Sequence, residues 1–397
     1  MFLFPNLNYL YYRDESIIKM KVAYVSTYLP QQCGIATYTD YLIHGLQKVS
    51  HELEIKVVAE KDASPLKQGK FEVVPCWDRN ENYVEPILSN VKDADVVHIQ
   101  HEYNIYGLDE RLPMLCEELK ASAKRSIITI HCVRPSQISE RGAVDENFVK
   151  RIAELADKVI VHLESQEAVL QRLGIPSDKI HLIPHGTALS NVDKKISRSR
   201  LKLPEDGKIL LMFGFVKPFK GAHVSLEVLE EVREEVEDVY LFIAGGLAPT
   251  ASKEERDYVK FLRKRTKELN LHDKVIFPNR FFPNEDIPYI FGASDIVLLP
   301  YYHEDRSASG SFHLAIGAKR PVIASRIPKF EELKNICDEL LLLPYSTSGI
   351  ARTVIRLFKD KKFEQYVLDR TERYRRAISW PVIASRHLNL YGIDRGA

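Results

Sequence analysis

The sequence has few cysteines, and they form no metal-binding or redox pattern. The five are Cys33, Cys76, Cys116, Cys132 and Cys337, with no C-x-x-C pair. This scatter argues against a disulfide framework and a zinc site, and it suits a reducing compartment. The sequence also lacks any apolar run near the ~18 residues that a membrane-spanning helix needs. We therefore expect a cytoplasmic protein that holds no metal and no other cofactor.

An excess of charge of either sign is also missing. The chain has 56 Lys and Arg residues against 55 Asp and Glu, a net charge of +1. Proteins that bind nucleic acid normally carry a basic surface, so we expect no nucleic-acid partner. With 397 residues, the chain is too long for one compact core and predicts two domains.

The standard nucleotide-binding and metal-binding signatures are absent as well. The loop STYLPQQCGIATYT has Gly34 where the chain enters a helix, and it fits neither G-x-G-x-x-G nor the P-loop pattern. Gly34 either lets backbone amides approach a phosphate or sugar, or simply forms a strand-to-helix turn. The acidic DAD segment at 93–95 precedes a strand, so we interpret it as structural.

What the sequence does contain is an alternation of short β-branched runs and helix-length segments. Apolar strands separated by helices are typical of parallel sheets buried on both faces, which predicts an α/β fold. The predicted strands are Lys21–Ser26, Glu54–Ala59, Val96–Gln100, Ser126–His131, Lys158–His162, Ile180–Pro184, Ile209–Phe213, Val239–Ala244, Lys274–Phe277, Ile296–Leu299, Pro321–Ala324 and Leu340–Leu343.

The polar stretch 186–208 is the best candidate for a domain boundary. We therefore expect one Rossmann-like domain over 21–190 and a second over 191–377, followed by a last helical segment, 378–397. Residues 1–20 form an extension that is rich in aromatic residues and makes a poor signal peptide. One interpretation of the extension is a mis-assigned start or a short docking segment. The other is a segment whose aromatic side chains contact a membrane surface or a partner.

Loops at the carboxyl ends of parallel strands are where ligands gather in such folds. In the first half, His101 and Glu102 follow one strand, and His131 and Arg134 follow the next. Charged groups there must reach solvent or a partner. A sugar-binding role and a purely structural hydrogen-bonded role both remain open for these side chains.

In the second half, the loop GFVKPFKG brings two cations to the start of a helix. Gly214 permits the turn, and Lys217 and Lys220 stand before the helix that opens at Gly221. Two ammonium groups at a helix N-terminus favour a ligand with two or more negative charges. The alternative is a solvated surface turn.

A serine- and glycine-rich segment provides a similar helix start nearer the C-terminus. Ser309, Gly310 and Ser311 lead into a predicted helix over 312–318. Their N–H groups can point at a phosphate. Ser309 can also serve as a simple N-cap, and the two roles are compatible.

Taken in order, these motifs resemble the family 4 retaining glycosyltransferases of GT-B fold. The motifs are QCGIATYT, VVHIQHEY, TIHC, LIPHG, FGFVKPFKG, LFIAGG, SDIVLLPY and SGSFHLAIGAKRPVIAS. The resemblance implies two Rossmann-like domains that face each other across a cleft. The second would hold a nucleotide sugar and the first the acceptor. A last helix near Trp380–Tyr391 would cross back to the first domain.

The resemblance also implies roles for single residues. Gly34 would lie near the donor phosphates, His131 near the transferred sugar, and Lys220 on the diphosphate, with Ser309–Ser311 on its other side. Lys217 would assist Lys220. The other expected donor-site residues are Gly214, Gly245, Arg280, Phe281, Glu304 and Asp305. The expected acceptor- or sugar-site residues are His101, Glu102, Arg134 and His185.

The sequence departs from the family pattern at two places. Phe215 stands where the family usually has an arginine, and Lys217 is the nearest substitute. Arg306 and Leu314 stand where the family usually has two glutamates, the second of which binds the ribose. Glu304 or Asp305 is the nearest replacement for the first.

The expected activity is metal-independent transfer of a hexose with retention of configuration. The donor would be of GDP-mannose or UDP-glucose type, and the acceptor a glycan, a lipid-linked acceptor or a small polyol. Contact with the inner face of the membrane and the oligomeric state stay open. The alternatives are a sugar-nucleotide epimerase, a phosphorylase of similar build, and a pseudoenzyme or subunit that only binds nucleotide sugar.

Overall fold

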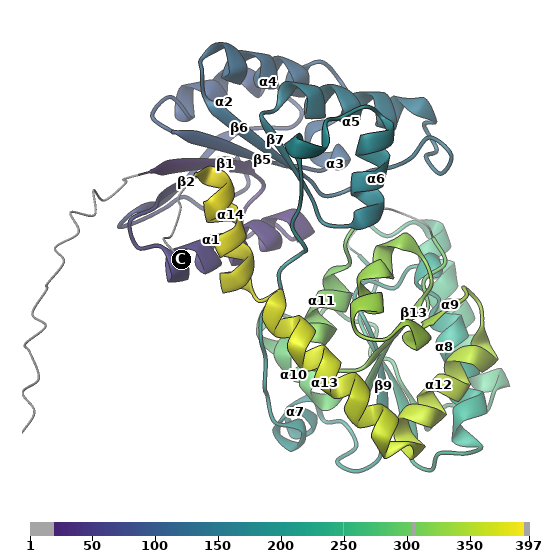
Figure 1. Cartoon of the computed structure of the whole chain (residues 1–397). Helices are drawn as coiled ribbons and strands as arrows, with labels where there is room; N and C mark the ends of the chain where they lie inside the picture. The colour runs from purple at the N-terminus through teal and green to yellow at the C-terminus, as the bar shows by residue number, and fades with distance from the viewer. Residues whose placement is uncertain (1–19, 249, 304–306, 393–397) are drawn as a thin grey trace, which may run out of the picture.

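The computed structural model describes residues 20–248, 250–303 and 307–392, which form two α/β domains, one above the other in Figure 1. The first domain contains an eight-stranded sheet of order β3-β4-β2-β1-β5-β6-β7-β8. Its strands are β1 (Lys21–Ser26), β2 (Glu54–Glu60), β3 (Leu66–Gln68), β4 (Phe71–Trp77), β5 (Val96–His101), β6 (Arg125–Ile130), β7 (Lys158–Val161) and β8 (Ile180–Leu182). Every pairing in it is parallel except that of β3 with β4.

Helices cover both faces of this sheet. Its central strands β1, β5 and β6 are buried along almost their whole length, so both faces need a helical cover there. The helices are α1 (Gly34–Val49), α2 (Val84–Asn90), α3 (Tyr103–Tyr106), α4 (Arg111–Ala121), α5 (Ala143–Leu155) and α6 (Glu164–Arg172), with a 3-10 turn, η1 (Ser177–Lys179).

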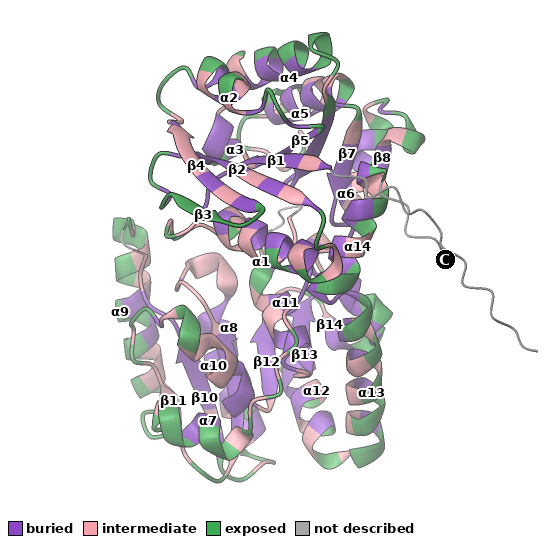
Figure 2. Ribbon diagram, turned by 90° about the vertical axis from the view of Figure 1, so that its left-hand side faces the viewer, coloured by how far each residue is buried: buried purple, intermediate pink, exposed green. Residues whose placement is uncertain are grey.

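The second domain has a six-stranded parallel sheet of order β11-β10-β9-β12-β13-β14. The strands are β9 (Lys208–Phe213), β10 (Val239–Ala244), β11 (Val275–Ile276), β12 (Ile296–Leu299), β13 (Val322–Ser325) and β14 (Leu341–Leu342). The helices are α7 (Lys194–Leu201), α8 (Ala222–Arg233), α9 (Lys253–Glu268), α10 (Ile287–Ala293), α11 (Gly310–Gly317), α12 (Thr347–Lys359) and α13 (Lys361–Ala377). The 3-10 segments are η2 (Pro218–Lys220), η3 (Asn284–Asp286), η4 (Pro328–Asn335) and η5 (Asp338–Leu340). In Figure 2 the strands of both sheets are mainly buried, whereas exposed residues gather on outer helices such as α9 and α13.

The last helix, α14 (Trp380–Tyr391), returns to the first domain and lies against α1 (Figure 1). A Cβ added to Gly45 of α1 would lie 2.8 Å from the carbonyl oxygen of Trp380, so only glycine allows this close approach. The Tyr391 hydroxyl lies 2.7 Å from Nδ1 of His98 and also contacts the Tyr24 hydroxyl. The predicted return of the C-terminal helix is therefore confirmed.

The two domains are joined by backbone hydrogen bonds where the chain passes between them. Thr187 N–H donates to the Ile378 carbonyl at 2.9 Å, and Trp380 N–H donates to the Thr187 carbonyl at 3.2 Å. Closer to the cleft, Ser165 N–H donates to Oε1 of Glu331 at 2.9 Å. These contacts fix how the carboxyl ends of the two sheets face each other.

The predicted fold class is confirmed, and each predicted strand overlaps a strand of the structure. The hairpin formed by β3 and β4 was not predicted. Pro75 interrupts the apolar run of β4, and a proline within such a run argues against a strand in the middle of a sheet. The structure accommodates Pro75 opposite Ala59, beside an irregularity in the register between β2 and β4.

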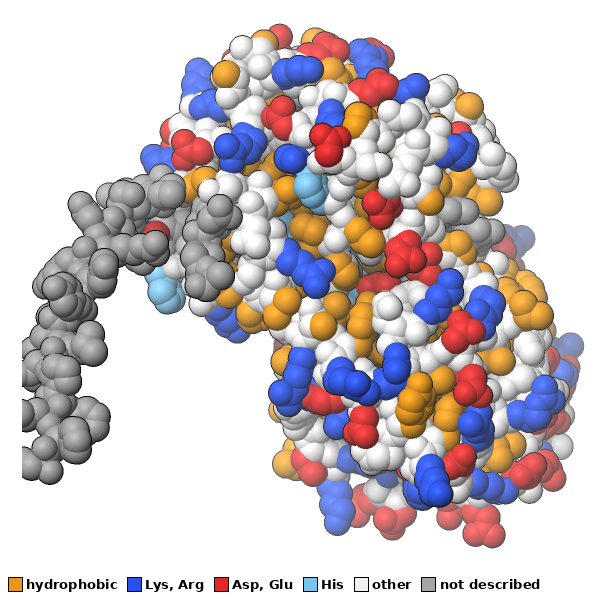
Figure 3. All heavy atoms as spheres, viewed as in Figure 1, with side chains coloured by type: hydrophobic (Ala, Val, Ile, Leu, Met, Phe, Trp, Pro, Cys, Tyr) orange, Lys and Arg blue, Asp and Glu red, His pale blue; other side chains and the backbone are white. Residues whose placement is uncertain are grey.

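No described helix is long and apolar enough to cross a membrane. On the face shown in Figure 3, positive and negative side chains are interspersed over both domains. That face therefore has no broad patch of one sign, in agreement with the near-zero net charge.

Candidate active site

An opening of about 640 Å³ lies between the domains at the carboxyl ends of their strands. The first domain contributes the loop from β1 to α1, and the second contributes the loops after β9 and β10 and a segment before α10. The lining residues are Leu29–Gly34, Thr37, Phe213–Phe215, Lys220, Ala244–Gly246 and Phe281–Glu285. This is the place where α/β sheets of this kind bind ligands.

Two glycines at this opening leave space that the protein itself does not use. Gly34 is the first residue of α1 and Gly310 the first residue of α11. A Cβ added at either position would meet no heavy atom within 4 Å. Gly34 lines the opening itself, and both glycines line a smaller cavity of about 170 Å³ that shares Gly34 and Thr37 with it. Packing does not require glycine here, whereas a ligand that approaches the two helix N-termini closely would.

Gly214 and Gly245 have the opposite character, because the protein itself fills the space beside them. A Cβ on Gly245 would lie 2.0 Å from the Gly214 carbonyl oxygen. Gly214 has a φ of +100°, and its Cβ would lie 2.9 Å from Nζ of Lys220. These predicted donor-site residues line the opening, but their glycine identity is explained by packing and backbone conformation.

Of the two predicted lysines, Lys220 faces the opening and Lys217 points elsewhere. Desolvation by burial lowers the pKa of Lys220 to about 8, with the charges of Lys329 and Lys217 lowering it further. Nζ of Lys217 lies 3.2 Å from Oε1 of Glu255 on α9, so its charge is already paired. Lys220 is therefore the cation best placed for an anionic ligand.

The serine-rich segment forms the start of α11 as predicted. The Ser309 side chain accepts a hydrogen bond from Phe312 N–H at 3.3 Å, which confirms its N-cap role. The Ser311 hydroxyl lies 3.5 Å from the Phe213 carbonyl oxygen, close to the Gly214 turn. The free N–H groups at the start of α11 therefore lie beside the loop that carries Lys220.

His131 lies at the end of β6, buried, and both of its ring nitrogens are engaged. Nε2 lies 2.8 Å from Oε1 of Gln100, and Nδ1 lies 3.1 Å from Nε2 of His162. Desolvation lowers its pKa well below the usual range, and the nearby His162 adds to this effect. The next residue, Cys132, forms a backbone bridge with Ser307 of the second domain. His131 therefore lies behind the surface of the opening, at the junction of the domains.

The loop residues His101, Glu102 and Arg134 form a cluster with structural contacts. His101 is fully buried, and burial lowers its pKa to about 3. Glu102 caps α3 by accepting from Asn104 N–H at 2.8 Å. The Arg134 guanidinium lies 3.7 Å from the buried carboxylate of Asp145 and stacks 4.7 Å from the Tyr103 ring centroid. These contacts account for Glu102 and Arg134 without a ligand, whereas both ring nitrogens of His101 lack a hydrogen-bond partner among the described residues.

His185 lies nearer to the junction of the domains and lines the smaller cavity. Its Nδ1 lies 2.7 Å from the Gly186 carbonyl oxygen, and its ring centroid lies 4.4 Å from that of His313. Burial lowers its pKa well below the usual range. This predicted sugar-site residue therefore contacts an open space beside Gly34 and Gly310.

Phe215, which stands where the resembled family usually has an arginine, forms an aromatic wall of the opening together with Phe281. Phe215 and Phe281 lie with ring centroids 6.3 Å apart, and both line the opening. Phe281 is 52% exposed, so its face is available to a ligand. Arg280 instead stacks its guanidinium 4.3 Å from the Phe282 ring centroid. Glu304 and Asp305 lie outside the described residues.

Two side chains at or near the opening, Lys329 and Gln31, are not among the predicted site residues. Lys329 on η4 is buried, and its Nζ donates to the hydroxyl of Ser307 at 2.7 Å, beside the Cys132 bridge. No sequence motif singled it out, although it follows the end of β13. Gln31 lines the opening and donates to Glu60 at 2.8 Å.

Glu60 in turn forms an ion pair with Arg79, which follows β4. Arg79 was not predicted because the β4 strand was not recognised, and Glu60, at the end of β2, belongs to no motif that indicates this pairing.

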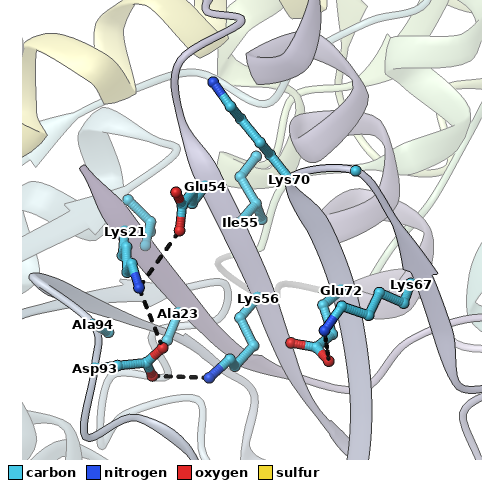
Figure 4. A pocket seen from close by; sticks show the side chains of 12 residues that line it. Lys21, Ala23, Glu54, Ile55, Lys56, Lys67, Lys70, Glu72, Asp93 and Ala94 are labelled. Atoms are coloured by element: carbon cyan, nitrogen blue, oxygen red, sulfur yellow. Dashed lines mark hydrogen bonds and ion pairs between the residues drawn. The ribbon is translucent and has the colours of Figure 1, made fainter. Parts of the chain in front are cut away.

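A separate cavity, of about 330 Å³, lies at the opposite end of the first sheet (Figure 4). Its charged side chains are paired with one another: Nζ of Lys56 lies 2.8 Å from Asp93, and Nζ of Lys21 lies 3.6 Å from Glu54 and 3.7 Å from Asp93. Asp95 accepts from Lys21 N–H at 2.8 Å. The acidic DAD segment therefore stabilises the starts of the strands, as the structural interpretation predicted.

The described residues contain no cluster of three or more His, Cys, Asp or Glu side chains arranged to hold a metal ion.

Two family models match the chain in succession. The model described as Glycosyltransferase Family 4 matches residues 33–191, and the model described as Glycosyl transferases group 1 matches residues 193–373. Their junction falls inside the polar stretch between the two sheets.

Curated relatives are distant. The putative glycosyltransferase YtcC of Bacillus subtilis is 27% identical over 187 residues, 47% of this chain and 45% of that protein. The match thus spans about half the length of that relative. The alpha-monoglucosyldiacylglycerol synthase of Streptococcus pneumoniae is 24% identical over 356 residues, 84% of this chain and 76% of that protein.

Among solved structures, HepE of Anabaena in complex with UDP superposes with a TM-score of 0.70 at 14% identity. The superposition covers 94% of this chain and 99% of that one. At this level of identity the similarity shows the fold.

Proposed function

The chain belongs to the family 4 glycosyltransferases of GT-B fold, and from this premise we propose that it moves a hexose, with retention, from a nucleoside-diphosphate sugar to an acceptor hydroxyl. A nucleotide-sugar donor is supported by HepE, whose structures hold UDP and UDP-glucose. Retention from an α-linked donor is supported by the name of the pneumococcal relative, which specifies an alpha-glucosyl product.

The observation that carries the proposal is a pair of open glycines at two adjoining cavities, the larger of which Lys220 lines. Gly34 and Gly310 begin two helices from different domains, and no protein atom needs the space beside their Cα atoms. A diphosphate between them would meet two helix N-termini and the Lys220 ammonium. The donor binding site therefore uses groups of both domains.

In the proposed reaction the bond from the sugar C1 to the diphosphate oxygen breaks, and C1 bonds to the acceptor oxygen on the same face. The nucleoside diphosphate leaves with the electron pair, and its phosphate oxygen takes the acceptor proton. Lys220 and the N–H groups of α11 would stabilise the negative charge that develops. Among the described residues that line the opening, Glu285 is the one carboxylate, so the lining offers no carboxylate pair for a double displacement.

The aromatic wall of Phe215 and Phe281 is proposed to stack on the nucleotide base, because an exposed ring face suits any base. UDP-glucose and GDP-mannose are the two donor types we propose, and the UDP complexes of HepE put UDP-glucose first.

For the acceptor we propose a glycan, a polyol or a lipid-linked acceptor. The last would bring the enzyme to the inner face of a membrane. A subunit that only binds nucleotide sugar is the second candidate, because Leu314 lines the smaller cavity where the family has its ribose-binding glutamate.

The test is release of nucleoside diphosphate from UDP-glucose, GDP-mannose and ADP-glucose in EDTA, with glycan, lipid-linked and polyol acceptors. We expect release from one donor, and a fall of about 10²–10³-fold in Lys220→Met. NMR of the product should show the anomeric configuration of the donor, and inversion would contradict the retaining mechanism.

A thermal shift with a sugar nucleotide but no release would favour the binding subunit over the transferase. Neither shift nor release with any donor would contradict the donor site itself.

A further inference from the structure

Buried histidines near the junction of the domains include a pair whose hydrogen bonds have a defined direction. His162 follows β7, and its Nδ1 lies 2.8 Å from the carbonyl oxygen of Ile183. A carbonyl oxygen can only accept, so Nδ1 of His162 carries the hydrogen. In a neutral imidazole the other nitrogen is then an acceptor, and Nε2 of His162 faces Nδ1 of His131 at 3.1 Å.

The assignment of donor and acceptor at His162 also determines the hydrogen bonds of His131. Nδ1 of His131 must donate to His162, which leaves Nε2 of His131 with a lone pair. The amide of Gln100 lies 2.8 Å from that Nε2, and its NH₂ group has no other partner among the described residues. Rotating the amide by half a turn places the NH₂ group on Nε2. Every contact from Gln100 to Ile183 then pairs one donor with one acceptor.

If the donors and acceptors of these hydrogen bonds were exchanged, the histidine pair would need one more proton. If Nε2 of His131 donated to Gln100, His162 would have to donate from both nitrogens and carry a positive charge. Burial disfavours that charge and lowers the pKa of His162 to about 4, although its bond to Ile183 opposes the effect. The neutral chain is therefore the arrangement at neutral pH.

The backbones of the two histidines are held by one further side chain, Gln166. Its amide oxygen accepts from the N–H groups of His162 and Leu163 at 2.8 and 3.0 Å, and its NH₂ group donates to the carbonyl of His131 at 3.0 Å. The rings are therefore fixed in position relative to each other before any ligand arrives.

We propose that His162 is a positioning residue that holds His131 in the tautomer with its hydrogen on Nδ1. Nε2 of His131 is then a hydrogen-bond acceptor, occupied by Gln100 in this structure and available to a sugar hydroxyl when the amide moves aside. The catalytic consequence rests on the proposed function, whereas the tautomer does not. His162 acts through His131 and needs no contact with the sugar.

The experiment reads the tautomer directly, by ¹⁵N NMR of the full chain labelled at histidine, with the His131 signals assigned by their loss in His131→Asn. We expect His131 to show hydrogen on Nδ1 and a bare Nε2. His162→Gln should keep this pattern, because the glutamine amide can accept from His131 and donate to Ile183. His162→Leu should move the hydrogen toward Nε2.

The matched control is His387→Leu, which removes another buried histidine with a pKa lowered to about 4. It should leave the tautomer of His131 unchanged even if it lowers stability. In the transfer assay, His162→Leu should lower kcat about 10–100-fold, and His162→Gln much less.

Hydrogen on Nε2 of His131 in the unmodified protein would overturn the proposal, and so would an unchanged tautomer in His162→Leu. If His162→Leu does not fold, the unmodified protein and His162→Gln still decide the question. A failed donor assay with the expected tautomer would contradict the proposed function and leave this inference standing.

Discussion

At the scale of single residues, Lys220 is distinguished by the pKa of its ammonium group. Desolvation lowers that pKa from the usual range to about 8, and Lys329 and Lys217 contribute further. A bound diphosphate favours the charged form, so binding takes up a proton wherever free Lys220 is neutral. Where the terminal phosphate of the ligand is ionised, the affinity for a nucleoside diphosphate should therefore be constant up to about pH 8 and fall above it.

We predict that the dissociation constant of UDP, or of GDP if that is the base used, rises toward tenfold per pH unit above about pH 8. Calorimetric titrations between about pH 7.5 and 9.5 measure this, since the terminal phosphate titrates nearer to pH 6 and stays ionised there. Lys220→Met should bind more weakly with a flat profile. The exposed Lys264 supplies the control Lys264→Met, which should behave like the unmodified protein.

At the scale of elements, α1 carries two glycines whose roles differ. Gly45 lies against α14, and a Cβ there would lie 2.8 Å from the Trp380 carbonyl oxygen. We predict that Gly45→Ala lowers the free energy of unfolding by about 1–3 kcal/mol, because the helices must move apart. Gly34→Ala should change it by less than about 0.5 kcal/mol, since its Cβ meets nothing. Urea denaturation of both variants measures the difference.

The variants Gly34→Ala and Gly45→Ala should also differ in nucleotide binding, in the opposite sense to their difference in stability. Gly34→Ala should weaken nucleotide binding although it leaves stability intact, whereas Gly45→Ala should do the reverse at temperatures where it is folded. Unchanged nucleotide affinity in Gly34→Ala would show that the open space beside Gly34 is not a ligand space.

The elements also show which parts of the site a sequence can reveal. Lys220 and the start of α11 were predictable because each stands in a strand–loop–helix unit, where position along the chain fixes position at the sheet edge. The ion pair of Lys217 in the same loop was not predictable, because its partner Glu255 comes from α9 and no local pattern shows that contact. The pairing of His131 with His162 joins neighbouring strands across 31 residues, which spacing alone does not show.

At the scale of the whole molecule, buried neutral histidines connect the first domain, α14 and the junction. The pKa of His162 and of His387 is lowered to about 4 by burial, and those of His98 and His131 fall well below the usual range for the same reason. In the unfolded chain these histidines titrate near pH 6.5. Below that pH the unfolded state binds more protons, so stability is full above about 6.5 and is lost toward pH 4.

We predict that the free energy of unfolding falls steeply between pH 6.5 and 5, by up to about 1.4 kcal/mol per pH unit for each such histidine. Urea denaturation at closely spaced pH values measures this. His387→Leu, which removes one titrating group, should make the slope shallower. A free energy that stays level from pH 7 to 5 would contradict the neutral state of these histidines.

The central claim is that both domains bind the diphosphate of a nucleotide sugar at the starts of α1 and α11. The most direct measurement is calorimetric titration of UDP and GDP, in EDTA, into the unmodified protein and into Gly310→Ala, whose added Cβ touches no protein atom. We expect one-to-one binding of at least one nucleotide and about tenfold or greater weakening in Gly310→Ala, with unchanged unfolding free energy. Absence of binding by either nucleotide, or equal affinity in the variant, would contradict this claim.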